Sequence, residues 1–240
     1  MKNLFIISIL FVFVNMQAQT FIKQESDTTI ITEYINGQLW AYRNIGNFVV
    51  GMTNYEEKDD YGKYYQIHIY INNLSKESAT FNPEGVTSSL LTKKGETIDL
   101  VVYSHEQFMK KVKRSQAWAM ALTSFSTGLN AGMAGYSTTY TTAYRANGTP
   151  YTQISTHYNA AAASAANIAA QAQITTLGKT MEEDKKAKEQ GYLKINTIHS
   201  GEAIVGYMNI KHKRGTTMTI NIPINGHVYS FDWDVTKKKK

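Results

Sequence analysis

Apolar and polar residues alternate along several short segments in the first and the last parts of the chain. Residues 64–71 alternate most clearly. A strand directs successive side chains to opposite faces, so this period of two predicts one apolar face and one mixed face. The apolar face comprises Tyr65, Ile67, Ile69 and Ile71, and the mixed face comprises Tyr64, Gln66, His68 and Tyr70.

An Asn-Gly pair joins two further alternating segments. Asn36 and Gly37 separate residues 28–35 from residues 38–43. Both residue types tolerate positive φ, so the pair predicts a tight β-hairpin. Further strands are expected over residues 48–53, 86–91 and 97–103.

After residue 103 the strand-like alternation of apolar and polar residues ends and helix signals begin. Ser104 and Gln107 form a capping box, which predicts a helix from about residue 105 to about residue 132. Residues 136–158 are rich in Thr and Tyr, and we interpret them as a β-hairpin or a mobile loop. Residues 159–173 are mostly alanine, a strong helix former, and predict a second helix that continues to residue 189.

Strand patterns return in the last part of the chain. They cover residues 192–198, 203–211, 216–222 and 227–233. The fold class is therefore mainly β with a helical insertion. Strand number and turn spacing favour an immunoglobulin-like antiparallel β-sandwich that is interrupted by a long antiparallel helical hairpin.

The expected organisation has five segments. A positive residue, Lys2, precedes an apolar run that ends at Val14, and Ala18 offers a cleavage site. This order of features is typical of a secretory signal peptide. The segments are a signal peptide (1–18), the first part of the sandwich (19–103), the insert with its Tyr/Thr-rich tip (104–191), the second part of the sandwich (192–235) and a basic tail (236–240).

The composition narrows the function classes. The chain has no cysteine, which excludes disulfides, thiolate catalysis and a cysteine-ligated zinc site. We expect export to the periplasm, the outer membrane or the cell surface. The net charge of +6 sits largely in clusters that are either solvated faces or contacts to anionic lipid or acidic glycans. We expect no nucleic-acid partner, because export separates the protein from nucleic acids.

No pattern of catalytic or ligand-binding residues stands out. The six histidines are scattered, and none forms the i, i+4 pair of a helical zinc site. Asp232 and Asp234 flank Trp233, and we interpret them as a solvent-facing pair beside a core tryptophan. We therefore expect a protein without enzymatic activity, metal or cofactor.

The insert carries the most unusual pattern in the chain. Residues 117–135 contain no charge, and small residues recur every four positions in both predicted helices. Such faces allow close helix packing within the hairpin, between copies of the chain or inside a membrane, and the sequence leaves these three alternatives open. Candidate interaction residues are Gly128, Gly132, Ala162, Ala166 and Ala170 in the helices, with Tyr136, Tyr140, Tyr144 and Tyr151 at the tip.

The leading interpretation is an envelope protein that contacts itself, another envelope protein or the membrane surface through the insert. An alternative is a carbohydrate- or ligand-binding module. Its binding surface would use aromatic residues on a face of the sandwich, namely Trp40, Tyr42, Tyr64 and Tyr70.

Several short motifs also carry a resemblance. They are Tyr103-Ser104-x-Glu106-x-Phe108, Ala117-Trp118-Ala119, residues 191–197 (GYLKINT), Gly201-Glu202, Gly206 and Tyr229-x-Phe231-x-Trp233. With these motifs the chain resembles a group of uncharacterised exported proteins of Bacteroidetes bacteria, over most of its length after about residue 60. The resemblance implies export and an envelope setting, and it implies no activity and no site residues.

Overall fold

The computed structural model describes residues 20–22, 29–144 and 150–236. The predicted signal peptide (1–18) and most of the basic tail (237–240) lie outside these residues. The chain divides into two compact units. Among the described residues, the β unit comprises 20–22, 29–57, 63–102 and 193–236, and the helical unit comprises 58–62, 103–144 and 150–192.

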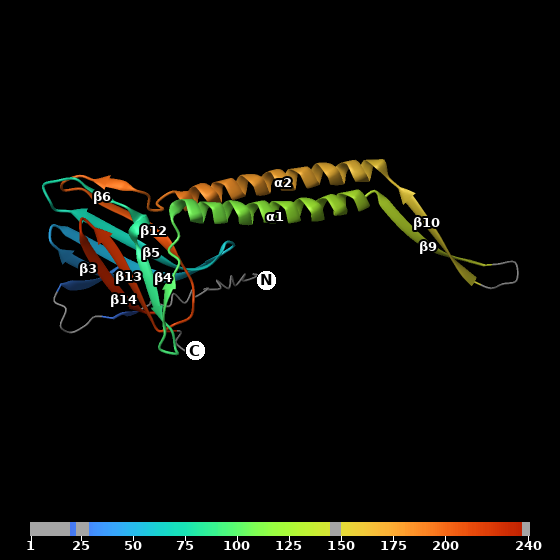
Figure 1. Ribbon diagram of the computed structural model, residues 1–240. Coiled ribbons are helices and arrows are strands. Elements are labelled where there is room, and N and C mark those ends of the chain that lie inside the picture. Colours follow the sequence, from blue (N-terminus) through green and yellow to red (C-terminus); the bar gives the residue numbers. More distant parts are fainter. Residues whose placement is uncertain (1–19, 23–28, 145–149, 237–240) are drawn as a thin grey trace, which may run out of the picture. The chain divides into compact units, whose positions relative to one another are not determined.

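Two five-stranded antiparallel sheets form the β unit (Figure 1). The first sheet has the order β12 (Ala203–Lys211), β5 (Gly62–Asn73), β4 (Phe48–Asp59), β3 (Gln38–Ile45) and β2 (Ile30–Ile35). The second has the order β1 (Thr20–Phe21), β14 (His227–Asp234), β13 (Thr217–Ile224), β7 (Thr87–Leu91) and β8 (Thr97–Leu100). Short strands β6 (Ala79–Phe81) and β11 (Asn196–Ile198) pair separately, and a 3-10 turn covers Pro83–Gly85.

The inner faces of the two sheets make one apolar core. Tyr229 in β14 donates a hydrogen bond of 2.7 Å to the backbone oxygen of Ile45 in β3, which ties the sheets together. The predicted apolar face of β5 is completely buried, as the alternation requires. The core also buries Phe48, Phe81, Phe231 and Trp233. The mainly β fold with a helical insertion, consistent with a β-sandwich, is thus confirmed.

The Asn36-Gly37 turn adopts the expected hairpin geometry, and a second described Asn-Gly pair does the same. Asn36 and Gly37 have φ values of 51° and 76°, and Ile35 pairs with Gln38 across them. Asn225 and Gly226 connect β13 to β14 in the same way, with φ values of 46° and 80°. Positive φ at both central residues is what a two-residue hairpin turn requires.

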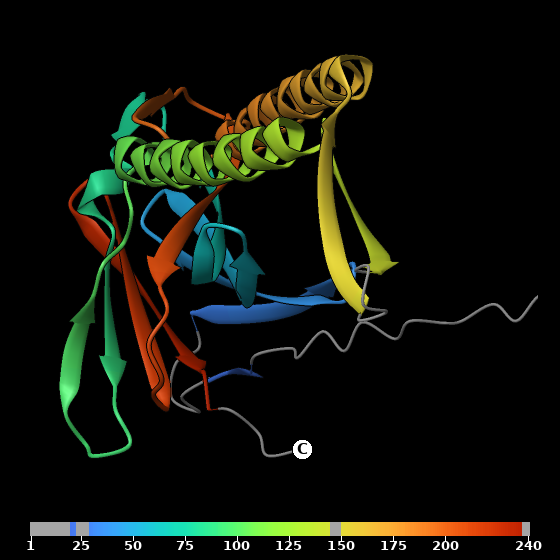
Figure 2. The ribbon, with the colours of Figure 1, turned by 90° about the vertical axis from the view of Figure 1, so that its right-hand side faces the viewer.

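The helical unit contains two long helices and a two-stranded ribbon (Figures 1 and 2). Helix α1 (His105–Met133) begins at the Ser104–Gln107 capping box, and α2 (Ala160–Glu189) begins at Asn159, whose side chain accepts a hydrogen bond from the Ala162 backbone. Between them, β9 (Tyr136–Tyr144) pairs antiparallel with β10 (Pro150–Tyr158). The Tyr/Thr-rich segment therefore contains a β-hairpin.

Three expected strands have different bounds in the structure, and one expected exposed residue is buried. The strand expected over 97–103 ends at Leu100, and the strand expected over 192–198 is reduced to β11. The side chain of Tyr192 instead donates a hydrogen bond of 2.8 Å to the backbone oxygen of Tyr103, and both residues belong to the helical unit. The strand expected over 48–53 continues to Asp59 as β4, and Tyr64 is buried rather than on an exposed mixed face.

Candidate functional site

Small side chains mediate the contact between α1 and α2. Ala131 in α1 and Ala163 and Ala170 in α2 are buried. Gly135, just after α1, is equally enclosed: a Cβ atom there would lie 2.9 Å from the Cβ of Ala163 and 2.7 Å from the Tyr158 ring. Close backbone approach at these positions therefore contributes to the contact, together with larger side chains such as that of Met120, which lies against Gly178.

Five large apolar side chains of α1 lie exposed on its other face. We call this set the α1 stripe. Its members are 53–72 % exposed, and consecutive members lie four, three, four and four residues apart. At 100° per residue they occupy one narrow strip, turned away from Gln116 and Ala131, which face α2. The α1 stripe comprises Trp118, Leu122, Phe125, Leu129 and Met133.

The predicted interaction residues fall into three groups. Gly128 and Gly132 are exposed beside the α1 stripe, and a Cβ atom at either position would meet nothing within 4 Å. Ala162 and Ala166 are half-buried and Ala170 is buried, so the alanine series of α2 belongs to the helix pair. Tyr136 and Tyr140 are exposed in β9, and the Tyr136 ring lies 5.0 Å from that of Tyr158. The side chains of Tyr144 and Tyr151 lie outside the described residues.

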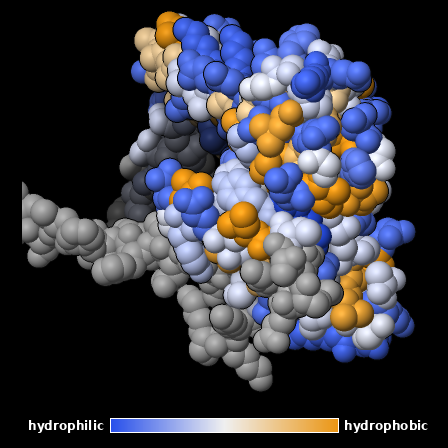
Figure 3. Space-filling view, turned by 90° about the vertical axis from the view of Figure 1, so that its left-hand side faces the viewer, coloured by the Kyte–Doolittle hydropathy of each residue, from blue (hydrophilic) through white to orange (hydrophobic). Residues whose placement is uncertain are grey.

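Large exposed apolar residues of the β unit are distributed differently. Leu74, Val205 and Val228 lie on separate strands or loops. Figure 3 views the molecule from the left-hand side of Figure 1, and there hydrophobic groups are interrupted by hydrophilic ones. The α1 stripe is different because its members are successive on a single helix face and residues 117–135 carry no charge.

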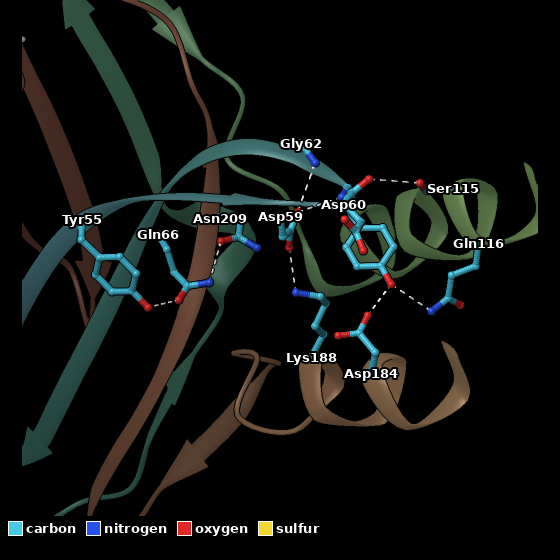
Figure 4. A network of polar contacts seen from close by, with 11 residues as sticks. Tyr55, Asp59, Asp60, Gly62, Gln66, Ser115, Gln116, Asp184, Lys188 and Asn209 are labelled. Atoms are coloured by element: carbon cyan, nitrogen blue, oxygen red, sulfur yellow. Dashed lines mark hydrogen bonds and ion pairs between the residues drawn. The ribbon is translucent and has the colours of Figure 1, made fainter. Parts of the chain in front are cut away.

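A polar cluster holds residues 58–62 within the helical unit (Figure 4). Tyr61 donates a short hydrogen bond to the carboxylate of Asp184 and accepts one of 3.0 Å from the amide of Gln116. Lys188 donates a hydrogen bond of 2.7 Å to Asp59 and lies 5.1 Å from the centre of the Tyr61 ring. The cluster therefore joins the segment to both helices.

The electrostatics of this cluster indicate a structural role. Burial, together with the hydrogen bond to Asp184, raises the pKa of Tyr61 to about 12, so the phenol stays protonated near neutral pH. The positive charge of Lys188 is paired with Asp59. A protonated phenol and a paired ammonium group lack the reactivity of a general base or a nucleophile.

The described residues contain one exposed Ser–His contact. The Ser78 hydroxyl lies 2.9 Å from Nδ1 of His199. Glu202 is close, yet its carboxylate accepts a hydrogen bond from the backbone N–H of His199 and not from the imidazole. A nucleophile–base pair needs a third group that orients the base, and Glu202 is not in that position. Among the described residues no cluster of His, Asp and Glu has the geometry of a metal site.

The sequence contains a signal for the α1 stripe but only part of a signal for the polar cluster. The four–three–four spacing of residues 118–129 is visible in the sequence, although an apolar strip of this kind normally predicts burial. Residues 59–62 (DDYG) indicate a polar turn, but Tyr61 and Asp184 are 123 positions apart, so the sequence could not pair them.

Within the part of the chain that the structure describes, neither helix is long and apolar enough to cross a membrane. No family model, no curated protein and no solved structure matches the chain.

Proposed function

We propose that this chain is an exported, non-enzymatic protein of the cell envelope that associates with a second copy of itself through the α1 stripe. The observation that carries the proposal is the set of five large apolar side chains that are 53–72 % exposed on one face of α1. Export rests on the order of Lys2, the apolar run to Val14 and Ala18.

The spacing of the α1 stripe favours another helix as its partner. Apolar residues alternately four and three apart form the seam of a coiled coil, in which each side chain inserts between four residues of the facing helix. Trp118, Leu122, Phe125 and Leu129 follow this spacing. The exposed Gly128 and Gly132 flank the seam and leave room for a second backbone to approach closely.

The absence of charge around the seam favours a second copy over a charged partner. Residues 117–135 carry no charged side chain, so two identical α1 faces meet without electrostatic repulsion. The same segment offers nothing to attract an acidic or a basic protein. A two-fold dimer buries the same face of both copies, so each stripe residue contributes twice.

Sedimentation velocity of residues 19–240 over a range of concentrations tests the proposal. We expect a monomer–dimer equilibrium, and we expect Leu122→Gln or Phe125→Gln to shift it to monomer, because each substitution removes two apolar side chains from the interface at about 1.5–3 kcal/mol each. Ile168→Gln is the matched control, since Ile168 is an exposed apolar residue of α2 outside the stripe.

Three results would contradict the proposal. The first is a monomer at every concentration. The second is a dimer that Ile168→Gln weakens as much as Leu122→Gln does. The third is a monomer that floats with liposomes of phosphatidylethanolamine and phosphatidylglycerol and loses this binding in Phe125→Gln, which would identify lipid as the partner of the stripe.

A further inference from the structure

Three aromatic side chains gather on the outward face of the first sheet of the β unit. Trp40 and Tyr42 are two residues apart in β3 and therefore point to the same side. Tyr70 lies in β5, and its ring centre is 6.4 Å from that of Tyr42. All three are half-buried, whereas the alternate residues Ala41, Ile69 and Ile71 are fully buried in the core.

The Tyr42 ring lies across the backbone of Gly51 in the neighbouring strand β4. Tyr42 and Gly51 are directly paired, and a Cβ atom at residue 51 would lie 2.4 Å and 2.5 Å from two carbons of the ring. Real Cβ atoms do not approach other atoms so closely, so any other residue would displace the ring. Glycine at this position therefore lets the Tyr42 ring approach the backbone of β4 closely.

The other two rings extend and border this surface. The Trp40 ring is inclined by 19° to the Tyr42 ring, and their centres are 6.1 Å apart, close to the two-residue rise of a strand. The two rings are therefore stacked in nearly parallel orientation. Tyr70 is inclined by 76° to Tyr42 and stands as an upright border. We call Trp40, Tyr42 and Tyr70 the aromatic platform.

One carboxylate and two exposed apolar side chains border the platform. Ile31 is directly opposite Tyr42, and Val205 is directly opposite Tyr70. Glu33 in β2 is directly opposite Trp40, and it is exposed. Burial and then the negative charge of Glu33 raise the pKa of Tyr42, so its hydroxyl remains a donor at neutral pH. The platform thus combines flat apolar faces, phenolic donors and a carboxylate acceptor.

We propose that the aromatic platform, with Glu33 at its border, binds a neutral saccharide chain. A pyranose ring has an apolar C–H face and a rim of hydroxyl groups, which match an aromatic ring face bordered by donors and an acceptor. The negative charge of Glu33 disfavours anionic ligands such as nucleotides and acidic glycans. The site lies entirely in the β unit, so it is independent of the α1 stripe.

Affinity gel electrophoresis of residues 19–240 tests this site. Gels that contain hydroxyethylcellulose, mixed-linkage β-glucan, galactomannan or xylan are compared with a gel that contains no polysaccharide. We expect at least one polysaccharide to retard the protein and Trp40→Ala to weaken the binding about tenfold or more, which is the scale of one lost aromatic contact. Tyr140→Ala is the matched control, because Tyr140 is exposed on the helical unit and lies outside the α1 stripe.

Gly51→Ala tests the geometry of the platform rather than its composition. The substitution adds one methyl group against the Tyr42 ring. We expect Gly51→Ala to weaken binding although Trp40, Tyr42 and Tyr70 are all retained. Circular dichroism establishes that the variant is folded. Tyr34→Ala is the control for an exposed aromatic residue of the same edge of the sheet, since Tyr34 in β2 points to the face opposite Glu33.

Three outcomes would overturn the inference. One is the absence of retardation by all four neutral polysaccharides. Another is retardation that Trp40→Ala and Gly51→Ala leave unchanged. The last is equal weakening by Trp40→Ala and Tyr140→Ala, which would place the binding outside the platform.

Discussion

The two units of this protein differ in how they arrange exposed large apolar residues. In the β unit Trp233 is completely buried, whereas in the helical unit Trp118 is 72 % exposed. Both units bury apolar side chains: the β unit buries aromatic and branched residues, and the helical unit buries Phe108, Val112 and Tyr192 together with small residues such as Ala131 and Ala163. The difference is the α1 stripe, which leaves large apolar residues exposed on a single helix face, as is typical of association sites.

The largest expected effect tests the contribution of the buried Trp233 to the stability of the β unit. Trp233→Ala should destabilise the protein by roughly 3–5 kcal/mol, because it leaves a cavity between Met218 and Phe21, whose ring centre lies 5.3 Å from that of Trp233. Urea denaturation followed by circular dichroism measures the change. Trp118→Ala should alter the free energy of unfolding of the monomer by no more than about 0.5 kcal/mol. Equal losses of unfolding free energy in the two variants would show that Trp233 and Trp118 contribute equally to folding, which would contradict this difference between the units.

A smaller effect tests the close packing of the two helices. Gly135→Ala places a methyl group within 3 Å of Tyr158 and Ala163 and should destabilise the helical unit by about 1–3 kcal/mol. Gly128→Ala meets nothing within 4 Å and should stabilise α1 by up to about 1 kcal/mol, since alanine is the better helix former. Thermal unfolding at a concentration where the protein is monomeric compares them. The same sign for both variants would contradict the assignment of the two glycines to different faces.

The smallest effect concerns the polar cluster around Tyr61. Tyr61→Phe removes the hydrogen bonds to Asp184 and Gln116 and should cost about 1 kcal/mol near neutral pH. Because the folded state raises the pKa of Tyr61 from 10.0 to about 12, its contribution is complete below pH 10 and is lost as the pH rises through 12. The stability difference between wild type and Tyr61→Phe should therefore shrink between pH 9.5 and about pH 12.

The exposed Tyr140 provides the control for this pH dependence. Tyr140→Phe should leave both the stability and its pH profile unchanged. Tyr55 in the β unit also has a pKa raised to about 12, so only the difference between wild type and variant isolates Tyr61. A constant difference over this pH range would show that the Tyr61 hydroxyl is not involved.

The sequence predicted the elements better than the contacts between them. Alternation identified β5 and its buried face, and Asn36-Gly37 located its hairpin, because these signals are local. The capping box placed the start of α1 for the same reason. The burial of Tyr64 and the pairing of Asp59 with Lys188 depend on residues far apart in the sequence, so no local pattern contained them.

The candidate site was predicted in part. The recurrence of small residues every four positions identified Gly128 and Gly132, which the structure places beside the α1 stripe. The same pattern grouped them with the alanines of α2, which contribute to the contact between the helices. Leu122 and Phe125 were not singled out, because an apolar strip at helical spacing normally predicts a buried face. Whether such a strip is covered depends on which face α2 occupies, and that is a property of the tertiary structure.

The absence of cysteine permits a direct test of the proposed dimer. Leu122→Cys introduces a single thiol in the α1 stripe, and Lys113→Cys introduces one at an exposed position about 180° away around the helix. If two α1 stripes face each other, mild oxidation at micromolar concentration should convert Leu122→Cys to a disulfide-linked dimer on a non-reducing gel and leave Lys113→Cys monomeric. Equal cross-linking of the two variants, or none in Leu122→Cys, would contradict self-association through the α1 stripe.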